Sequence, residues 1–359
     1  MKKKLKILIC PLNWGLGHAT RSAPIIEKFL EENHEIVIGG NGMSYEYLKM
    51  KFPKLRHIYI NGININYGHN RTFSIFFFLN IPHIIINTIK ENKKLKRIQK
   101  NENFDIIISD NRFGLSNKNI LSIYMTHQTS IFLPGYLKIL NSLATKVHRF
   151  IINKYSLCWI PDIEADLSIS GKLSADVNGL NIRKIGILSR FSSKKVLSDI
   201  EKKYDFLFIL SGPEPQRSIF EDIIYNKFIN SNYKIVILRG KPGSVETKNN
   251  TSDIKFYNHV NDDEFMRFCS QSSTIVCRSG YSSIMDLARI KRKAVIVPTP
   301  GQTEQEYLTE HLSENFGFKA VSQKQFEKFD IEKLHFNENW HITEDNNALN
   351  LAVKELENI

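Results

Sequence analysis

The sequence predicts an α/β protein made of two Rossmann-like domains that face a central cleft. Apolar runs alternate with amphipathic helical stretches along all 359 residues, which is typical of parallel sheets with crossover helices. This pattern loosens once, in a segment rich in Ser, Gly and Lys before residue 205. The length also favours two domains. We therefore expect an N-terminal domain over 1–188, a linker over 189–204, a C-terminal domain over 205–340, and a helix over 341–359 that packs back on the N-terminal domain.

Each strand is expected where an apolar run is bounded by polar or turn-forming residues. In the first half these runs are Leu5–Cys10, Glu35–Ile38, Ile58–Ile60, Asp105–Ser109, Ile120–Met125 and Ser156–Ile160. In the second half they are Phe206–Leu210, Lys234–Leu238, Ile254–Tyr257, Thr274–Cys277 and Ala294–Val297.

Composition narrows the class of protein. The chain has 49 Lys and Arg against 37 Asp and Glu, a formal net charge of +12. Such an excess suits nucleic acid, an anionic membrane or phosphorylated substrates, although an AT-rich genome would also enrich Lys. There is no module of alternating aromatic and basic residues, so nucleic acid is not an expected partner. The four cysteines form no C-x-x-C pair, which favours buried thiols in a reducing cytoplasm over disulfides or a metal site.

The N-terminal stretch "MKKKLKILIC" is basic and then apolar, but its apolar part runs directly into Pro11. We interpret it as the first strand, not a signal peptide. The segment 72–100 is apolar around Phe76, Phe77 and Phe78 and then strongly basic. Polar residues interrupt it, so it is not expected to span a bilayer. It predicts either a peripheral contact with an anionic membrane or a core helix followed by a solvated basic one.

A glycine turn follows the first strand in "PLNWGLGHATR". Gly15 and Gly17 allow close backbone approach at the carboxyl end of a strand. The helix is expected to start near Pro24, which leaves His18 in the turn, facing the cleft. A neutral imidazole there is suited to act as general base for a hydroxyl. A dinucleotide site is disfavoured because Thr20 stands where the fingerprint needs a third glycine.

The segment "CRSGYSSIMDLARIKRKAVIVPTPGQTEQE" contains the most specific pattern in the chain. Small residues crowd the start of a helix, where free amides suit a diphosphate. Ser283 and Asp286 could form a capping box instead. Polar side chains in the later loop can read sugar hydroxyls. The residues expected to bind the donor are Ser279, Gly280, Ser282 and Ser283 at the helix start and Gln302, Gln305 and Glu306 in the loop.

Together, "GLGHATR", "SGPEPQR" and this segment resemble GT-B glycosyltransferases of the family 28 type, which includes the peptidoglycan N-acetylglucosaminyltransferase. The resemblance is greater to a bacterial and archaeal branch with the motifs GHATR and GPEPQR. It covers both domains in order. It implies the GT-B fold and transfer of a sugar from a nucleoside diphosphate sugar.

The resemblance also implies roles for individual residues. His18 would be the catalytic base, Asp286 would bind the ribose, and Gln305 with Glu306 would read the donor sugar. The diphosphate would lie near Ser211, Gly212, Arg217, Arg278, Ser279 and Gly280, and the nucleotide base near Tyr257, His259 and Val260. The acceptor would lie near Gly15, Gly17, Arg21, Asp110, Arg112, His127 and Gln128. The chain departs from the family at Pro213 and Pro215, which lack an N–H, and at Glu306, where glutamine is usual.

The reaction expected from this resemblance is direct displacement with inversion, from a UDP-sugar to a lipid-linked or glycan hydroxyl. It would need no metal and no cofactor. The protein would be cytoplasmic or peripheral on the inner face of the membrane. Two alternatives remain. One is a nucleotide-sugar 2-epimerase, which would use carboxylates such as Asp110 and Asp162. The other is a nucleotide-sugar-binding protein without transfer activity.

Overall fold

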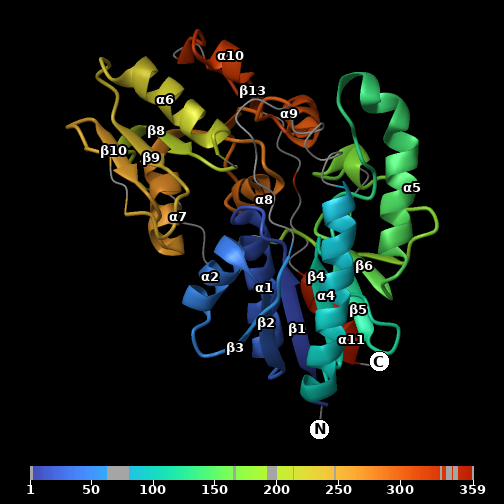
Figure 1. The fold of residues 1–359 in the computed structure, drawn as a ribbon. Helices are drawn as coiled ribbons and strands as arrows, with labels where there is room; N and C mark the ends of the chain where they lie inside the picture. Colours follow the sequence, from blue (N-terminus) through green and yellow to red (C-terminus); the bar gives the residue numbers. More distant parts are fainter. Residues whose placement is uncertain are drawn as a thin grey trace. The chain divides into compact units, whose positions relative to one another are not determined.

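The computed structural model describes residues 3–62, 81–164, 167–191, 200–212, 214–245, 248–331, 334–336, 342 and 347–357. The chain forms two compact units (Figure 1). The first consists of Met1–Ser189 together with Thr343–Ile359, and the second of Arg190–Ile342. Each is described below by itself.

The first unit is built on a seven-stranded sheet of order β3-β2-β1-β4-β5-β6-β7, in which every described strand pair is parallel. Its strands are β1 (Lys6–Pro11), β2 (Glu35–Gly40), β3 (Arg56–Tyr59), β4 (Ile106–Asp110), β5 (Leu121–Met125), β6 (Leu157–Ile160) and β7 (Ile182–Lys184). Its helices are α1 (Gly17–Glu31), α2 (Gly42–Lys51), α4 (Ile81–Glu102), η1 (Gly135–Leu140), α5 (Asn141–Ile152), η2 (Gly171–Leu173) and α11 (Ala348–Glu357).

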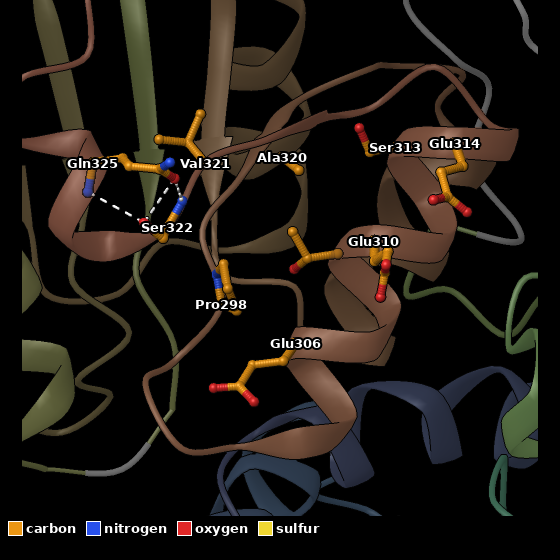
Figure 2. Close-up of a pocket in the computed structure, with 10 residues that line it drawn as sticks. Pro298, Glu306, Glu310, Ser313, Glu314, Ala320, Val321, Ser322 and Gln325 are labelled. Atoms are coloured by element: carbon orange, nitrogen blue, oxygen red, sulfur yellow. Dashed lines mark hydrogen bonds between the residues drawn. The ribbon is translucent and has the colours of Figure 1, made fainter. Parts of the chain in front are cut away.

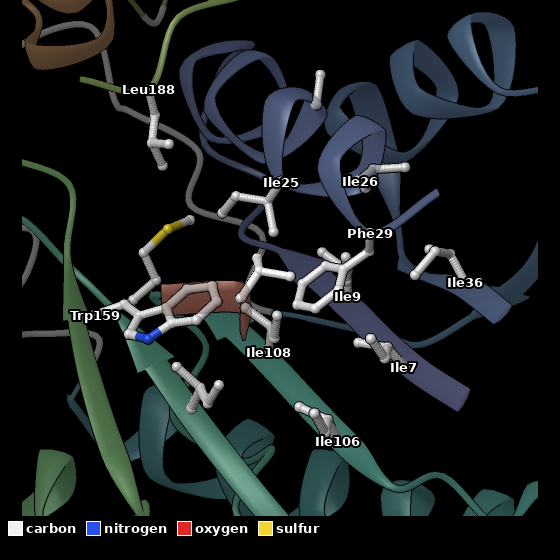
Figure 3. Packing of buried hydrophobic residues seen from close by; sticks show 14 of the residues in the cluster. Ile7, Ile9, Ile25, Ile26, Phe29, Ile36, Ile106, Ile108, Trp159 and Leu188 are labelled. Atoms are coloured by element: carbon white, nitrogen blue, oxygen red, sulfur yellow. The ribbon is translucent and has the colours of Figure 1, made fainter. Parts of the chain in front are cut away.

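The main core of the first unit lies between this sheet and α1 (Figure 3). Branched side chains of β1 and β4 meet the apolar side of α1, where Ile25, Ile26 and Phe29 are fully buried. The Phe29 ring stacks on Trp159, with ring centroids 6.5 Å apart. Continuous burial on both faces explains why the middle of β1 reads Ile-Leu-Ile-Cys and β4 begins with three isoleucines.

Helix α11 belongs to the first unit although it lies at the far end of the sequence. Ala352, Val353 and Leu356 join the same apolar core. At the helix end the Glu357 carboxylate lies 3.2 Å from His34 Nε2. This helix therefore supplies part of the support on which α1 and β1 rest.

The second unit contains a six-stranded parallel sheet of order β10-β9-β8-β11-β12-β13. Its strands are β8 (Tyr204–Ile209), β9 (Ile235–Leu238), β10 (Ile254–Tyr257), β11 (Ser272–Cys277), β12 (Val295–Ile296) and β13 (Lys319–Ala320). Its helices are α6 (Gln216–Phe228), α7 (Asp262–Gln271), α8 (Tyr281–Arg289), α9 (Thr303–Asn315) and α10 (Gln323–Phe326). Phenylalanine dominates its core, where Phe208, Phe220 and Phe326 pack edge to face.

The predicted α/β class with two parallel sheets is confirmed, and all eleven expected strands exist within two residues of their predicted ends. The short strands β7 and β13 were not predicted, because runs of three and two residues carry no detectable alternation. Half of the predicted linker, residues 192–199, lies outside the described residues.

The predicted start of α1 was wrong. The helix begins at Gly17 and contains Pro24, so His18 lies in the first helical turn and not in the loop. A residue before proline disfavours the helical region but can adopt it when packing compensates. Here Ala19, Ala23 and Ile26 are completely buried, which supplies that compensation.

Candidate active site

A polar cluster lies at the carboxyl end of the first sheet. Strand β1 pairs with β4 so that Pro11 faces Asp110, and the chain then turns into α1. The turn includes Gly15, whose φ of +72° is unfavourable for any other residue. Asp110 ends β4, while His18 and Arg21 occupy the first turns of α1. The parallel topology brings these side chains together from positions about ninety residues apart.

The cluster is held by contacts to the Asp110 carboxylate. His18 Nδ1 lies 3.0 Å from Asp110 Oδ1, and Arg21 donates from Nε to Oδ2 at 2.9 Å. A second Arg21 nitrogen donates to Oδ1. Arg21 also lies 3.1 Å from His127 Nδ1, and we assign that ring nitrogen as the acceptor because a guanidinium can only donate. Asp110 is fully buried, and Arg21 is almost so.

The charges in this cluster follow from burial and from Arg21. Burial alone would raise the pKa of Asp110, but Arg21 and His18 outweigh it and lower that pKa to about 2. Burial lowers the pKa of His18, and the neighbouring Arg21 guanidinium lowers it further against the opposing effect of Asp110. At neutral pH Asp110 is therefore an anion and His18 a neutral imidazole.

The contact with Asp110 defines which ring nitrogen of His18 can react. A carboxylate accepts but does not donate, so the Nδ1–Asp110 contact is a hydrogen bond only when Nδ1 carries the proton. Arg21 Nη2, 2.9 Å from the same Nδ1, is then a close contact and not a hydrogen bond, because a guanidinium can only donate. We assign this tautomer. Nε2 is then the nitrogen that can take a proton from a substrate, and Asp110 stabilises the imidazolium that results.

The other residues expected near the acceptor have different surroundings. Arg112 is buried and donates to Glu91 at 2.6 Å and to the carbonyls of Ile60 and Asn61 at 2.9 Å. It therefore ties β3 and α4 to β4, which corrects its expected place in the acceptor site. Gln128 is partly exposed, and its backbone N–H donates to Thr126 Oγ1. Gly17 is the first residue of α1.

In the second unit, helix α8 starts at the carboxyl end of β11, as the sequence predicts. Gly280 precedes it as N-cap with φ −69°, and a Cβ built there would meet no atom within 4 Å. The fold itself therefore does not require glycine at this position, which leaves room for a ligand to approach the helix amides. Ser282 and Ser283, both partly exposed, lie in the first turn.

Arg278 and Ser279 serve the fold instead of presenting polar groups to a ligand. The Arg278 guanidinium is buried over the Phe220 ring at 4.2 Å and donates to the Pro298 and Gln216 carbonyls. Burial lowers the pKa of Arg278 to about 9. Ser279 Oγ donates to the carbonyl of Gln305 at 2.9 Å. The expectation that Arg278 contacts the diphosphate is corrected, because its bonds hold β12 and α10 in place.

Asp286 is not part of a capping box. No side chain caps α8, and the Asp286 carboxylate instead accepts from Arg190 Nε at 2.8 Å and from the Arg190 backbone N–H at 3.3 Å. The Arg190 guanidinium also lies 4.6 Å from the Phe265 ring. The carboxylate thus anchors the first residue of the second unit, a role that the sequence did not suggest.

The polar loop before α9 is ordered by its own side chains. Gln305 Oε1 accepts from the backbone N–H of Thr299, and its amide donates to the side chain of Gln302. Glu306 accepts from the backbone N–H of Gly301 at 3.0 Å. Glu306 also lines a pocket of about 330 Å³ with Glu310, Glu314 and the α10 cap (Figure 2).

One residue of this loop was missed by the sequence analysis. Thr299 is buried, and its Oγ1 has no hydrogen-bond partner in the described part of the chain. It lies 3.8 Å from the position of a Cβ built on Gly212, whose φ is +90°. In the sequence, Thr299 is a single threonine between Pro298 and Pro300 and matches no motif that predicts a binding role. It pairs with Ser211–Gly212 as a place where a diphosphate oxygen could be bound.

Near that loop, Arg217 donates to Glu214 at 2.7 Å and to the Gly240 carbonyl at 2.6 Å. Burial would raise the pKa of Glu214, but hydrogen bonds from Arg217 and Ser218 lower it to about 2. Arg217 is therefore already paired, and a diphosphate would have to compete with Glu214 for it.

The expected nucleotide-base residues follow β10. Tyr257 packs against the buried Phe268 ring at 5.0 Å, which agrees with a core role for much of its ring. His259 is half-buried, and burial together with nearby Arg190 lowers its pKa. Val260 is buried.

Asp162 does not fit the epimerase alternative. Its carboxylate accepts from the backbone N–H groups of Ile163, Ile169 and Ser170 and from the Ser170 hydroxyl. These bonds fold the loop after β6 and leave no reason to assign it acid–base work.

Within the described residues, no group of three or more His, Cys, Asp or Glu is placed to hold a metal ion. Among the same residues, none of the helices has the length and apolar character needed to span a bilayer. All four cysteines are buried and unpaired, as expected.

Comparison with known proteins finds a family match for the donor-side segment and a fold match for the whole chain. Residues 206–351 match the glycosyltransferase family 28 C-terminal domain. The chain also matches solved glycosyltransferases over nearly its whole length. The fold is GT-B. Searched against curated proteins, the sequence found no match.

Three solved GT-B structures illustrate the likeness. The spinosyn rhamnosyltransferase SpnG complexed with thymidine diphosphate matches with a TM-score of 0.62 and 11% identity, covering 99% of this chain and 95% of that one. The glycotransferase of kitacinnamycin matches with a TM-score of 0.61 and 12% identity, covering 99% and 91%. MurG of Acinetobacter baumannii matches with a TM-score of 0.53 and 11% identity, covering 99% and 91%.

Proposed function

We propose that this GT-B protein is a glycosyltransferase that moves a sugar from a nucleoside diphosphate sugar, most simply a UDP-sugar, to a hydroxyl of a lipid-linked or glycan acceptor. The observation that carries the proposal is the neutral His18 held by the buried Asp110. The family 28 match of the second unit supports a donor of this class. Binding of thymidine diphosphate by SpnG makes a nucleoside diphosphate the natural leaving group.

In the proposed reaction, His18 Nε2 takes the proton of the acceptor hydroxyl as that oxygen attacks the anomeric carbon. The bond between the anomeric carbon and the diphosphate oxygen breaks, and the nucleoside diphosphate departs with the bonding electrons. Attack from the opposite side inverts the anomeric centre. The amides at the start of α8, with Gly212 and Thr299, are proposed to bind the diphosphate. No metal or cofactor is included in the proposal.

The reaction is tested by incubating the purified protein with UDP- and TDP-sugars and with glycolipid extracts, followed by mass spectrometry. Glycolipids from cells with and without the gene give the acceptor independently. Nucleotide binding without any turnover in either experiment would favour the binding-protein alternative. A change of the donor sugar into its C2 epimer would favour the epimerase.

A peripheral membrane contact through 72–100 is part of the same proposal. Phe76, Phe77 and Phe78 lie outside the described residues. In α4, three isoleucines are half exposed and basic residues follow them, which suits an anionic surface. The residues are Ile85, Ile86 and Ile89, then Lys90, Lys93, Lys94, Lys96, Arg97 and Lys100.

For the ribose, we expect Asp286→Asn to weaken UDP binding by one to two orders of magnitude. A carboxylate that accepts from two ribose hydroxyls makes charge-assisted bonds, and their loss costs about 1.5–3 kcal/mol. Isothermal titration calorimetry with UDP measures this. The same variant should also lower the melting temperature, because it weakens the bond to Arg190.

Arg190→Gln is the matched control for Asp286. It breaks the same ion pair but leaves the carboxylate in place, so UDP affinity should stay within a few-fold of wild type. If both variants lower the melting temperature equally and neither changes UDP affinity, Asp286 is only an anchor for Arg190 and is removed from the donor site.

A further inference from the structure

A polar pocket of the first unit lies between the end of β3 and helix α4, and is called the α4 pocket below. Its volume of about 560 Å³ falls within the range of roughly 300–1,000 Å³ that is usual for small-molecule sites. Tyr59 and Asn61 line it on the β3 side, and Asn87 lines it on the α4 side together with a row of cations. Because β3 and β4 run in the same direction, Tyr59 and Asp110 end their strands at the same edge of the sheet. The α4 pocket therefore shares this edge with the His18–Asp110 cluster.

Four cations lie on one side of α4, and all of them line the pocket. They are Lys90, Lys93, Lys94 and Arg97. Their spacing of three and four residues places like charges next to one another, which lowers helix stability unless an anion binds. All four are exposed, and within the described part of the chain none of them forms an ion pair. Lys6 and Arg56 of the same unit, by contrast, both pair with Glu102. The row on α4 is therefore a positive surface that the protein itself does not neutralise.

Glu91 is the only carboxylate among the described residues that line the pocket, and it is already bound. Its Oε1 accepts from Arg112 Nε at 2.6 Å, and its Oε2 accepts from the Gly114 backbone N–H at 2.8 Å. The side chain is buried, and the Arg112 guanidinium balances its charge. The exposed lysines are thus left for an anion from outside the protein.

The wall of the pocket opposite the cations is aromatic. The Tyr59 ring is 59% exposed and is supported edge to face by the buried Tyr45 ring, with ring centroids 6.3 Å apart. A ring held in this way offers a flat apolar face to a ligand. On α4, the Asn87 amide nitrogen donates to the His83 carbonyl at 2.9 Å, which leaves Oδ1 as the atom that can accept from a ligand hydroxyl.

These features together favour an acidic saccharide over other anions. Inorganic phosphate would use the cations but neither the Tyr59 ring nor the amides. Single-stranded nucleic acid is bound by several aromatic rings on which successive bases stack, and Tyr59 is the one aromatic residue that lines this pocket in the described part of the chain. A sugar ring that carries a carboxylate or phosphate uses all three parts, because its carbon face can pack on tyrosine while its hydroxyls reach amides.

We propose that the α4 pocket binds an acidic oligosaccharide, with one sugar ring on Tyr59 and its anionic groups on the cations of α4. As a statement about the acceptor this rests on the proposed function, but binding itself needs neither donor nor transfer. Arg112 lies two residues beyond Asp110 and donates to the carbonyls of Ile60 and Asn61. It thereby fixes the loop that lines the pocket to the strand that carries the proposed catalytic cluster. An acceptor glycan with acidic sugars would thus be held at the edge of the sheet where His18 lies.

The test is isothermal titration calorimetry of the full chain with trigalacturonate, which carries a carboxylate on every sugar ring, and without nucleotide. Binding should weaken as the salt concentration rises. The fully methyl-esterified trisaccharide has the same rings without charge and should bind about ten-fold more weakly or not at all. The double variant Lys90→Gln with Lys94→Gln should weaken trigalacturonate binding about ten-fold, through the loss of two exposed ion pairs. Lys96→Gln is the matched control, because this exposed lysine of α4 does not line the pocket.

A second variant tests the aromatic wall without changing any charge. Tyr59→Ala should weaken trigalacturonate binding about five- to ten-fold. Phe150→Ala is its control, because it removes a ring that is 67% exposed elsewhere on the first unit, and it should bind like wild type. Melting temperatures of all variants show whether they fold.

Several outcomes would overturn the proposal. One is the absence of trigalacturonate binding, and another is binding that the double variant does not weaken. Tighter binding of tripolyphosphate or oligothymidylate than of trigalacturonate, with no effect of Tyr59→Ala, would show a general anion site instead. These results are separable from the proposed function. Sugar transfer without trigalacturonate binding would refute the pocket alone, whereas trigalacturonate binding without any transfer would refute only the proposed reaction.

Discussion

His18→Ala should lower turnover by about 10²–10⁴ while leaving UDP affinity nearly unchanged. This is the usual range for the loss of a general base. His18 belongs to the first unit, outside the family 28 segment 206–351, and its ring lies against Asp110 and Arg21. Initial rates with the identified acceptor, together with calorimetry of UDP, separate the two quantities.

The pH dependence of kcat/KM is a second test of His18 as the general base. Because burial and Arg21 lower the pKa of His18 below its ordinary value of 6.5, the reactive neutral form persists into mildly acidic solution. The acid limb of kcat/KM should therefore lie below pH 6.5. His335→Ala, which removes an exposed histidine of the second unit, is the control and should keep both rate and profile. Turnover of His18→Ala within a few-fold of wild type would exclude His18 as the base.

Asp110→Ala should destabilise the protein by about 3–5 kcal/mol, the cost of removing one partner from a buried ion pair. Arg21 would keep its buried charge without the carboxylate that now accepts from two of its nitrogens. Chemical denaturation followed by circular dichroism measures the change. Asp222→Asn is the control, because its carboxylate is 65% exposed and pairs at the surface, and it should unfold close to wild type.

The Asp110→Asn variant separates the contribution of Asp110 to folding stability from its contribution to turnover. An amide keeps the size of the side chain and can still accept from Arg21, so the loss of stability should be smaller than for alanine. Turnover should still fall, because an amide does not stabilise the His18 imidazolium as a carboxylate does. The pKa of Asp110 is lowered from 3.8 to about 2, so its contribution to stability is complete above pH ~4 and is lost as the pH falls toward 2. Wild-type turnover in Asp110→Asn would show that His18 works without this partner.

Sequence patterns were sufficient to predict the fold because parallel strands that are buried on both faces appear in the sequence as short apolar runs. β9 consists entirely of Ile, Val and Leu, β1 and β4 each contain three consecutive Ile or Leu residues, and each strand was placed within two residues. The helix start at Gly17 was missed because the local rule about residues before proline was overridden by burial of Ala19 and Ala23. Packing of this kind depends on other elements of the fold and cannot be predicted from the sequence of the helix alone.

The site was harder to predict than the fold. Gly280 and His18 could be proposed as site residues because glycine turns after strands are visible in sequence. Arg112 and Arg278 were misassigned because a buried arginine that binds carbonyls looks, in sequence, like one that binds a phosphate. The contacts that decide the matter, Glu91 with Arg112 and Gln323 with Arg278, join residues 21 and 45 positions apart. Thr299 became visible only as a buried hydroxyl without a partner.

The position of α11 has a consequence for biosynthesis. Residues of α11 complete the apolar core beneath α1, although they are translated after the whole second unit. The second unit is therefore synthesised before the core of the first unit is complete, since Val353 and Leu356 join that core last. A premature stop codon just before α11 would spare the family 28 segment up to that point, yet damage the acid–base cluster more than three hundred residues upstream.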